Sequence, residues 1–344
     1  MPERRPLVSE FDSLLLDLDG VIYIGQQPVA HAAQAIEQCR SQFGVAVAFV
    51  TNNASRTPDS VSDQIQEIGL AARPADVVTS AQAVASHLAR ELPAGAKVLV
   101  VGGPGLVVAL TECGLVPVTL VSERPVAVAQ GFDPSVDWRM LAQAAGALHL
   151  GLPWVASNLD MTLPTELGRA PGNGSLVAAL TTATGRVPIS MGKPEAELVL
   201  EGIRRTGAAR PLVVGDRLDT DIAAAHAAKV PSLLVLTGIS TPLDLCNAPA
   251  DQRPDFIGAD LRALLVAHPA VDMTDGSTDA TVAHCGGWSV EIRAGTVSVL
   301  FSGEAPIDGV RALARLCWWA ADRDAASLLG VAELCEQLWP VGQR

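Results

Sequence analysis

The sequence predicts an α/β protein with a doubly wound parallel-sheet core, an inserted α/β domain and a small α+β C-terminal extension. Short apolar runs rich in β-branched residues alternate with alanine-rich helical runs, which is the pattern of parallel βα units. The chain has 344 residues, enough for two to three domains of about 150 residues each. After residue 270 the alternation gives way to paired strands and then two helical stretches.

The first βα units are expected within residues 1–76. Their strands and helices are predicted to alternate at 14–16, 31–42, 45–50 and 59–68. Thr57 and Pro58 mark the start of the last of these helices, because threonine caps helix N-termini and proline suits the first helical position.

A second set of units, residues 77–188, is expected to form the inserted domain. Its helices and strands are predicted at 81–92, 98–101, 106–113, 116–120, 127–130, 138–145 and 175–184. The earlier pattern then resumes at 194–205, 212–214, 220–228 and 232–236. We therefore predict one core, residues 1–76 and 189–266, interrupted by an inserted domain at 77–188.

Residues 267–344 are predicted to form an appended α+β domain. The small polar and acidic residues near 270–280 indicate a linker, and Ala294-Gly295 indicates a hairpin between strands 288–293 and 296–301. Helices are predicted at 310–321 and 325–338. Four of the 6 tryptophans are expected to form a small core or a docking face: Trp288, Trp318, Trp319 and Trp339. We expect a structural or regulatory role for this domain, without catalysis.

Composition excludes several classes of protein. The net charge of −13, from 24 basic and 37 acidic residues, argues against nucleic-acid binding and against attraction to anionic membranes. No apolar run reaches the roughly 18 residues of a membrane span, and residues 1–10 lack the apolar stretch of a secretion signal. The 6 cysteines are dispersed and form no CxxC pair, which favours reduced thiols and a cytoplasmic location.

Four short motifs lie where a parallel sheet places ligands, just beyond the carboxyl ends of strands. The first contains Asp17 and Asp19, followed by Gly20. Two carboxylates at a strand end suit an aspartate nucleophile with a second aspartate as general acid and base, or a hard cation bound by oxygen. Taken alone, the motif could equally be a pair of solvated acids beside a turn glycine.

The second and third motifs offer groups that bind anions. Thr51, Asn52 and Asn53 follow a strand, where a hydroxyl and backbone N–H groups can hold phosphoryl oxygens, although a simple polar loop is the alternative. Pro194 is predicted at the first position of a helix, with Lys193 at its positive end, where an anion is favoured. The alternative for Lys193 is an ordinary surface lysine.

The fourth motif follows the strand at 212–214. Asp216 is expected at the strand end and Asp221 one turn into the next helix, so both can point at one cation. Asp219 is expected to cap that helix. The alternative is an acidic helix N-terminus, where acids are common without any ligand.

Taken together and in this order, the motifs resemble those of the haloacid dehalogenase superfamily, and within it the type IIA phosphatases. Those enzymes carry a motif like DxDGV, then T/S-N-N, GKP and GDxxxxD, with a large α/β cap between the second and third motifs. The resemblance covers about residues 11–265 and implies a Rossmann-like core. Two cap segments also match: 157–160 resembles T/S-N-x-D, and 171–175 resembles PGxGS.

The resemblance implies a Mg²⁺-dependent phosphomonoesterase that works through an aspartyl-phosphate. Asp17 would be the nucleophile and Asp19 the general acid and base. The phosphate-binding residues would be Thr51, Asn52, Asn53 and Lys193. Mg²⁺ would be held by Asp17, the backbone carbonyl of Asp19, Asp216 and, through water, Asp221. Mn²⁺ or Co²⁺ stays open as a replacement.

The substrate expected from the resemblance is a small organic phosphate. The chain most resembles the bacterial glycerol-3-phosphate phosphatases of this branch, and 2-phosphoglycolate, sugar phosphates and pyridoxal phosphate remain alternatives. An aromatic content of 4% slightly disfavours pyridoxal phosphate, which calls for a ring-stacking pocket. A homodimer also stays open, because family members often pair through the cap.

Two interpretations from other classes compete with this one. A strand and glycine-rich turn at 98–105 could bind a dinucleotide, but the third glycine of that fingerprint is missing. A non-catalytic ligand-binding regulator could use the same fold. The intact Asp17, Asp19, Lys193 and Asp216 argue against that second alternative.

Overall fold

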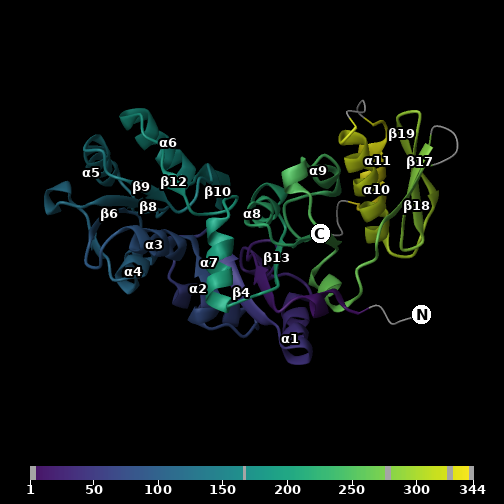
Figure 1. Cartoon of the computed structure of the whole chain (residues 1–344), viewed down its shortest axis with the longest axis horizontal. Helices are drawn as coiled ribbons and strands as arrows, with labels where there is room; N and C mark the ends of the chain where they lie inside the picture. The colour runs from purple at the N-terminus through teal and green to yellow at the C-terminus, as the bar shows by residue number, and fades with distance from the viewer. Residues whose placement is uncertain (1–4, 166–167, 276–279, 324–327, 341–344) are drawn as a thin grey trace. The chain divides into compact units, whose positions relative to one another are not determined.

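The computed structural model describes residues 5–165, 168–275, 280–323 and 328–340. The chain forms two compact units (Figure 1). The first comprises Met1–Val47 and Ala208–Arg344, and the second comprises Ala48–Gly207. These limits differ from the domain boundaries 1–76, 77–188, 189–266 and 267–344, which remain a prediction.

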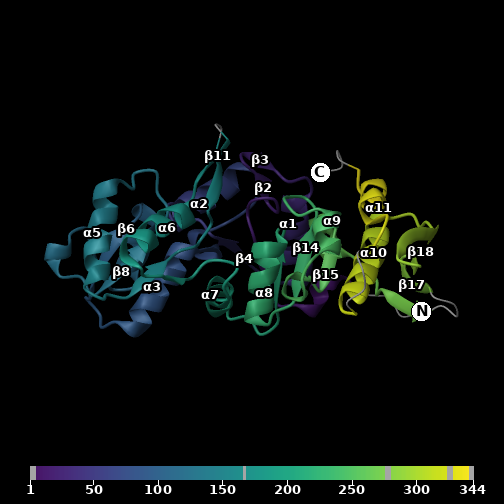
Figure 2. The same cartoon turned by 90° about the horizontal axis from the view of Figure 1, so that it is seen from above.

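The first unit contains a parallel sheet with the strand order β15-β14-β13-β1. Its strands are β1 (Ser13–Leu16), β13 (Pro211–Gly215), β14 (Ser232–Val235) and β15 (Phe256–Gly258). Every residue of β1 and β14 is buried, as expected for strands covered on both faces. The accompanying helices are α1 (Ala32–Phe43), the π-helix η4 (Leu218–Ile222), α8 (Ala223–Ala228) and α9 (Pro242–Cys246) (Figure 2). The parallel α/β core is thus confirmed.

Smaller elements complete this part of the unit. They are the hairpin strands β2 (Tyr23–Ile24) and β3 (Gln27–Pro28), and the 3-10 helices η1 (Leu7–Glu10), η5 (Ala250–Gln252) and η6 (Leu261–Leu265). None of these short elements was predicted from the sequence, and neither were α9 and β15.

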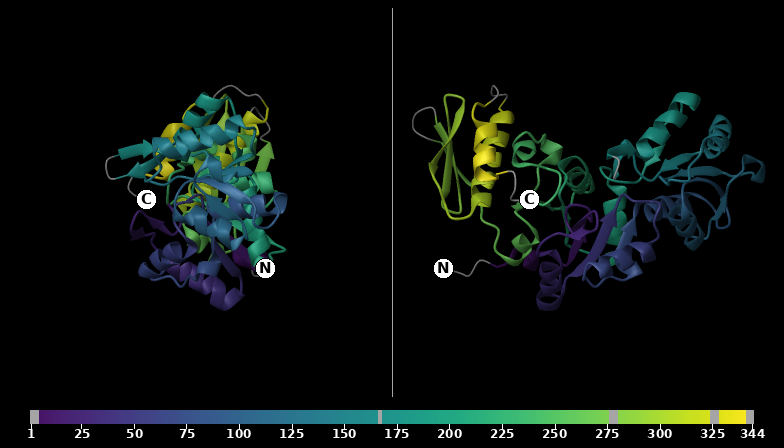
Figure 3. Two further views of the ribbon diagram at one scale, coloured as in Figure 1. Left: turned by 90° about the vertical axis from the view of Figure 1, so that its left-hand side faces the viewer. Right: turned by 180° about the vertical axis from the view of Figure 1, so that it is seen from behind.

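The C-terminal part of the first unit is an antiparallel sheet with the order β16-β17-β18-β19. Its strands are β16 (Asp272–Asp275), β17 (Ala280–Cys285), β18 (Trp288–Arg293) and β19 (Thr296–Phe301). Helices α10 (Pro306–Ala321) and α11 (Val331–Leu338) follow, and Figure 3 shows them beside this sheet. The α+β extension and its hairpin at 288–301 are therefore confirmed.

Two details of the extension differ from expectation. The predicted linker is wrong in part, because Asp272–Asp275 pair with β17 as a strand. The rest of that linker, 276–279, lies outside the described residues, as do positions 325–327 of the helix predicted at 325–338. Helix α10 also begins four residues earlier than predicted, with Pro306 in its first turn.

The extension shares a hydrophobic core with α9, β14 and β15. The Trp318 indole N–H donates to the Leu245 carbonyl oxygen at 2.8 Å, and the buried Arg311 guanidinium donates to the Ile257 carbonyl oxygen. Trp318 is buried in this core, with Trp288, Trp319 and Trp339 packed against it. The tryptophans thus form the small core that was one of the two expectations.

The second unit begins with two parallel strands and a helix. Strand β4 (Ala46–Thr51), whose first two residues belong to the first unit, pairs with β5 (Val77–Thr79), with Val50 opposite Val78. Helix α2 (Pro58–Glu67) starts as predicted, because the Thr57 hydroxyl accepts a hydrogen bond from the Ser60 N–H at 3.3 Å. The 3-10 helix η2 (Pro74–Asp76) leads into β5.

The rest of this unit is a five-stranded parallel sheet with the order β12-β9-β8-β6-β7. The strands are β6 (Lys97–Val101), β7 (Val116–Val118), β8 (Ala127–Gln130), β9 (Trp154–Ala156) and β12 (Ile189–Ser190). The helices are α3 (Ser80–Glu91), α4 (Pro104–Glu112), η3 (Val121–Glu123), α5 (Trp138–His149) and α6 (Asn173–Thr184). A hairpin of β10 (Thr162–Thr165) and β11 (Gly168–Pro171) lies between β9 and α6 in the chain. The predicted α/β insert is confirmed.

The glycine-rich turn after β6 serves packing. A Cβ atom on Gly105 would lie 2.6 Å from the carbonyl oxygens of Ala54 and Arg56, and the Gly105 N–H donates to the Ser55 carbonyl oxygen at 3.1 Å. This close backbone approach accounts for the glycine without a dinucleotide. Among the residues that the structure describes, no helix is both long enough and apolar enough to cross a membrane.

Candidate active site

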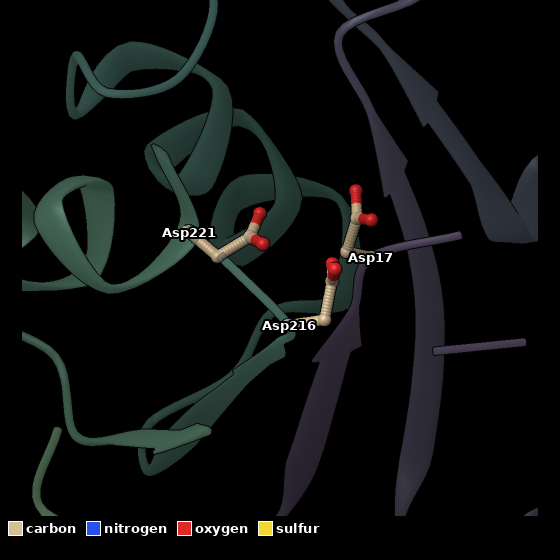
Figure 4. Close-up of side chains that lie close together, drawn as sticks. All are labelled: Asp17, Asp216 and Asp221. Carbon is tan, nitrogen blue, oxygen red and sulfur yellow. The ribbon is translucent and has the colours of Figure 1, made fainter. Parts of the chain in front are cut away.

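Three carboxylates of the first unit converge (Figure 4). Asp17 follows β1, Asp216 follows β13 and Asp221 lies in η4. One carboxylate oxygen from each lies within 4.8 Å of the others, and Asp216 and Asp221 are buried. Three carboxylates with no nitrogen or sulfur ligand suit a hard divalent cation. The structure thus brings together three of the four aspartates that the resemblance assigned to Mg²⁺, and their role as metal ligands stays a prediction.

Asp216 is held in place by a neighbouring loop. Its Oδ2 accepts a hydrogen bond from the Ile239 N–H at 2.6 Å. A Cβ atom on Gly20 would lie 2.5 Å from the Asp216 carboxyl carbon, and one on Gly238 would lie 2.0 Å from its Oδ2. Gly20 also has a φ of 85°, which favours glycine. The loops that carry both glycines can therefore pack directly on this carboxylate.

Asp221 is oriented within the π-helix. Its Oδ2 accepts a hydrogen bond from the Arg217 N–H at 3.1 Å. A Cβ on Gly215 would lie 2.2 Å from the Asp221 Cβ, so a glycine at the end of β13 makes room for it. Asp219 does not cap this turn, contrary to expectation. It instead forms an ion pair with Arg217 at 2.8 Å. The hydrogen bond from the Arg217 side chain lowers the pKa of Asp219.

Asp19 lies in a tight turn after β1. The Leu18 carbonyl oxygen accepts hydrogen bonds from the backbone N–H groups of Val21, Ile22 and Tyr23. The Asp19 side chain is exposed and does not join the three-carboxylate group. An exposed carboxylate two residues from Asp17 can reach a substrate, which suits an acid–base role. The metal contact expected of its backbone carbonyl stays a prediction.

The second unit holds the loop after β4. The Thr51 hydroxyl accepts a hydrogen bond from the Asn53 N–H at 3.1 Å. The Asn53 side-chain oxygen accepts hydrogen bonds from the N–H groups of Ser55 at 2.9 Å and Arg56 at 3.1 Å. These contacts fix the shape of the loop, and they occupy the Asn53 side-chain oxygen.

Lys193 is buried, with 4% of its surface exposed, which excludes the surface-lysine alternative. Its Nζ donates to the Val50 carbonyl oxygen at 3.4 Å. The helix predicted from Pro194 is wrong in its start, because α7 (Glu197–Thr206) begins three residues later. The reason is that both polar groups of the Lys193 backbone bond to the Asn52 side chain.

Sequence reasoning missed several residues that shape the site. Gly238 was not singled out, although it follows β14 at the same sheet edge as Asp17. That position, combined with glycine, was the available signal. The hydrogen-bonding partners of Asn52 were missed as well, since one of them, Lys193, lies 141 residues away in the chain.

Comparison with known families defines the class. A haloacid dehalogenase-like hydrolase model matches residues 14–116, and a HAD-hydrolase-like model matches residues 190–264. The chain therefore belongs to the haloacid dehalogenase-like hydrolases.

Particular relatives are phosphatases. The chain is 44% identical to the D-glycerol 3-phosphate phosphatase of Mycobacterium tuberculosis over 328 residues, 93% of this chain and 89% of the relative. The crystal structure of glycerol phosphate phosphatase from that organism with magnesium matches with a TM-score of 0.84 and 41% identity, covering 98% of this chain and 99% of that one. The acid sugar phosphatase of Staphylococcus aureus is 35% identical over 242 residues, covering 70% of this chain and 92% of the relative.

Proposed function

We propose that this chain is a Mg²⁺-dependent phosphomonoesterase that hydrolyses glycerol 3-phosphate to glycerol and phosphate. The observation that carries the proposal is the convergence of Asp17, Asp216 and Asp221 at the edge of a parallel sheet. The similarity to a D-glycerol 3-phosphate phosphatase over 93% of this chain supports the substrate.

The residues that would hold Mg²⁺ are Asp17, Asp216, the Asp19 backbone carbonyl and, through water, Asp221. An all-oxygen set with three carboxylates fits this ion, which keeps several of its waters. When bound, the ion would neutralise charge on the phosphate and on the attacking carboxylate.

The first chemical step is assigned to Asp17. One of its carboxylate oxygens bonds to phosphorus while the bond from phosphorus to the glycerol oxygen breaks. Asp19 gives its proton to that oxygen, so glycerol leaves neutral and Asp17 carries the phosphoryl group.

The second step returns the enzyme to its starting state. Asp19, now ionised, takes a proton from water, and the water oxygen bonds to phosphorus as the bond to Asp17 breaks. Acid–base help of this kind contributes about 10²–10⁴-fold to the rate. Lys193, Thr51 and the turn formed by Asn52 and Asn53 would bind the phosphoryl oxygens.

A sugar phosphate is the second candidate substrate, favoured by the 35% identity to an acid sugar phosphatase. 2-Phosphoglycolate and pyridoxal phosphate are further outcomes of the same test. The free thiols of all six cysteines support a cytoplasmic location, which cell fractionation would check. A homodimer is to be tested by analytical ultracentrifugation.

The experiment measures phosphate release from glycerol 3-phosphate and the alternative substrates, with and without Mg²⁺. We expect the highest kcat/KM for glycerol 3-phosphate and no turnover by Asp17→Asn. Asp219→Asn is the matched control, because Asp219 lies beside Asp221 but pairs with Arg217 on the surface. Phosphate release that is independent of Mg²⁺ or survives in Asp17→Asn would contradict the proposal.

A further inference from the structure

The cap motifs at 157–160 and 171–175 have no role in the chemistry described so far. We propose that Asp160 is a positioning residue that acts through Asn52 to hold the phosphate-binding Lys193 in place. This inference rests on the proposed function, because it assigns Lys193 to the phosphate. All of the residues concerned lie in the second compact unit.

The Asn52 side chain is fully occupied by protein groups. Its Oδ1 accepts a hydrogen bond from the Lys193 N–H at 2.8 Å, and its Nδ2 donates to the Lys193 carbonyl oxygen at 3.0 Å. The second Nδ2 hydrogen goes to Asp160 Oδ2 at 3.1 Å. With both amide hydrogens committed, the Asn52 side chain serves the Lys193 backbone, and only its backbone N–H remains for a phosphoryl oxygen.

Asp160 and the Lys193 backbone favour the same orientation of that amide. An asparagine side chain can be turned by 180°, which exchanges its oxygen and nitrogen. The turned amide would place Oδ1 against two acceptors, the Asp160 carboxylate and the Lys193 carbonyl, and Nδ2 against the Lys193 N–H. An ionised carboxylate only accepts hydrogen bonds, so Asp160 allows one orientation.

Asp160 is itself fixed by its surroundings. Its N–H donates to Asn158 Oδ1 at 3.1 Å, and its carbonyl oxygen accepts from the Gly174 N–H at 2.9 Å. The Asn173 Nδ2 donates to the Asn158 carbonyl oxygen at 2.7 Å. A Cβ on Gly172 would lie 2.3 Å from the Asp160 carbonyl oxygen. The two cap motifs therefore act as one support for this carboxylate.

The loop of Lys193 packs directly on the same support. A Cβ on Gly192 would lie 2.4 Å from the Ser157 carbonyl oxygen and 2.8 Å from Asn52 Oδ1. The Asn158 Nδ2 also donates to the Asn52 carbonyl oxygen at 2.8 Å. A continuous set of contacts thus runs from the glycine turn at 172–174 through Asp160 and Asn52 to Lys193.

The consequence is a quantitative dependence of phosphate binding on Asp160. A displacement of a binding group by about 1 Å can lower a rate by about 10²-fold. We expect Asp160→Ala to raise the inhibition constant of inorganic phosphate and to lower kcat/KM by ~10–100-fold. The Mg²⁺ concentration for half-maximal activity should stay unchanged, because the three carboxylates that would hold the ion come from the first compact unit.

Exchanging the two side chains in a double variant tests the contact between Asn52 and Asp160. Asn52→Asp places a carboxylate against Asp160 and removes the donor, so activity should fall at least as far as in Asp160→Ala. Adding Asp160→Asn restores a donor opposite that carboxylate and keeps an acceptor for the Lys193 N–H. The double variant should then regain about tenfold or more of the loss, since residues in one network are not additive.

Asp63→Ala, an exposed aspartate of α2, is the matched control and should behave as wild type. Thermal unfolding would report whether each variant folds. Two results from an active wild type would overturn this inference alone. One is a phosphate inhibition constant that is unchanged in Asp160→Ala, and the other is a double variant with no higher kcat/KM than Asn52→Asp. A folded wild type without phosphatase activity would instead overturn the proposed function.

Discussion

Acidification should destabilise the first compact unit through His268. Burial, and secondarily the charge of Arg311, lower the pKa of His268 from 6.5 to about 4. Its Nε2 accepts a hydrogen bond from the Ile257 N–H at 3.1 Å, and its ring packs edge-on against Phe256. The neutral imidazole is therefore the form that the fold around β15 requires.

The direction and size of this loss of stability follow from proton linkage. The unfolded chain binds a proton near the ordinary pKa of 6.5, whereas the folded chain binds it only near pH 4. The contribution of His268 to the free energy of unfolding is fully present above pH 6.5 and is lost as the pH falls toward 4. Between pH 7 and pH 5 the loss is about 1–2 kcal/mol, since one pKa unit corresponds to about 1.4 kcal/mol and solvent screens a partly buried group.

Urea unfolding followed by tryptophan fluorescence at pH 7 and pH 5 would measure this loss. The control is His268→Gln, whose side-chain oxygen can still accept from the Ile257 N–H but does not titrate. Its free energy of unfolding should fall by about 1–2 kcal/mol less than that of the wild type over this range. Equal pH dependence in the two proteins would refute the reasoning.

Three other changes have defined outcomes. Arg311→Met should lower the free energy of unfolding in urea by ~3–5 kcal/mol, because it leaves the largely buried Asp308 carboxylate without this partner, and adding Asp308→Leu should recover much of the loss. Gly238→Ala should raise the Mg²⁺ requirement in phosphate-release assays ~10–100-fold, because its Cβ would overlap Asp216. Thr57→Ala should cost ~1 kcal/mol in thermal unfolding by removing the helix cap.

The placement of ligands at the carboxyl ends of parallel strands explains why the approach of Asp17 to Asp216 could be predicted. The runs at 14–16 and 212–214 are recognisable as buried strands, and they pair with Leu16 opposite Val214. Side chains that follow the carboxyl ends of adjacent parallel strands must lie at one edge. Asp17 and Asp216 could therefore be brought together from sequence alone.

Contacts between distant residues explain what could not be predicted. The sequence around Pro194 favours a helix start, but the bonds from the Lys193 backbone to Asn52 delay it to Glu197. Likewise, the polar segment at Asp272–Asp275 resembles a linker, yet pairing with β17 makes it a strand. In both places tertiary pairing overrides the local preference of the sequence.

The central claim is that Asp17 attacks phosphorus. The most direct measurement is rapid acid quenching of the wild-type enzyme during turnover of glycerol 3-phosphate with Mg²⁺, followed by mass spectrometry of its peptides. We predict a peptide that carries one phosphoryl group on Asp17 and is absent from Asp17→Asn. Phosphate release with no phosphoryl group on Asp17 at any quench time, or with the group on another residue, would contradict the account.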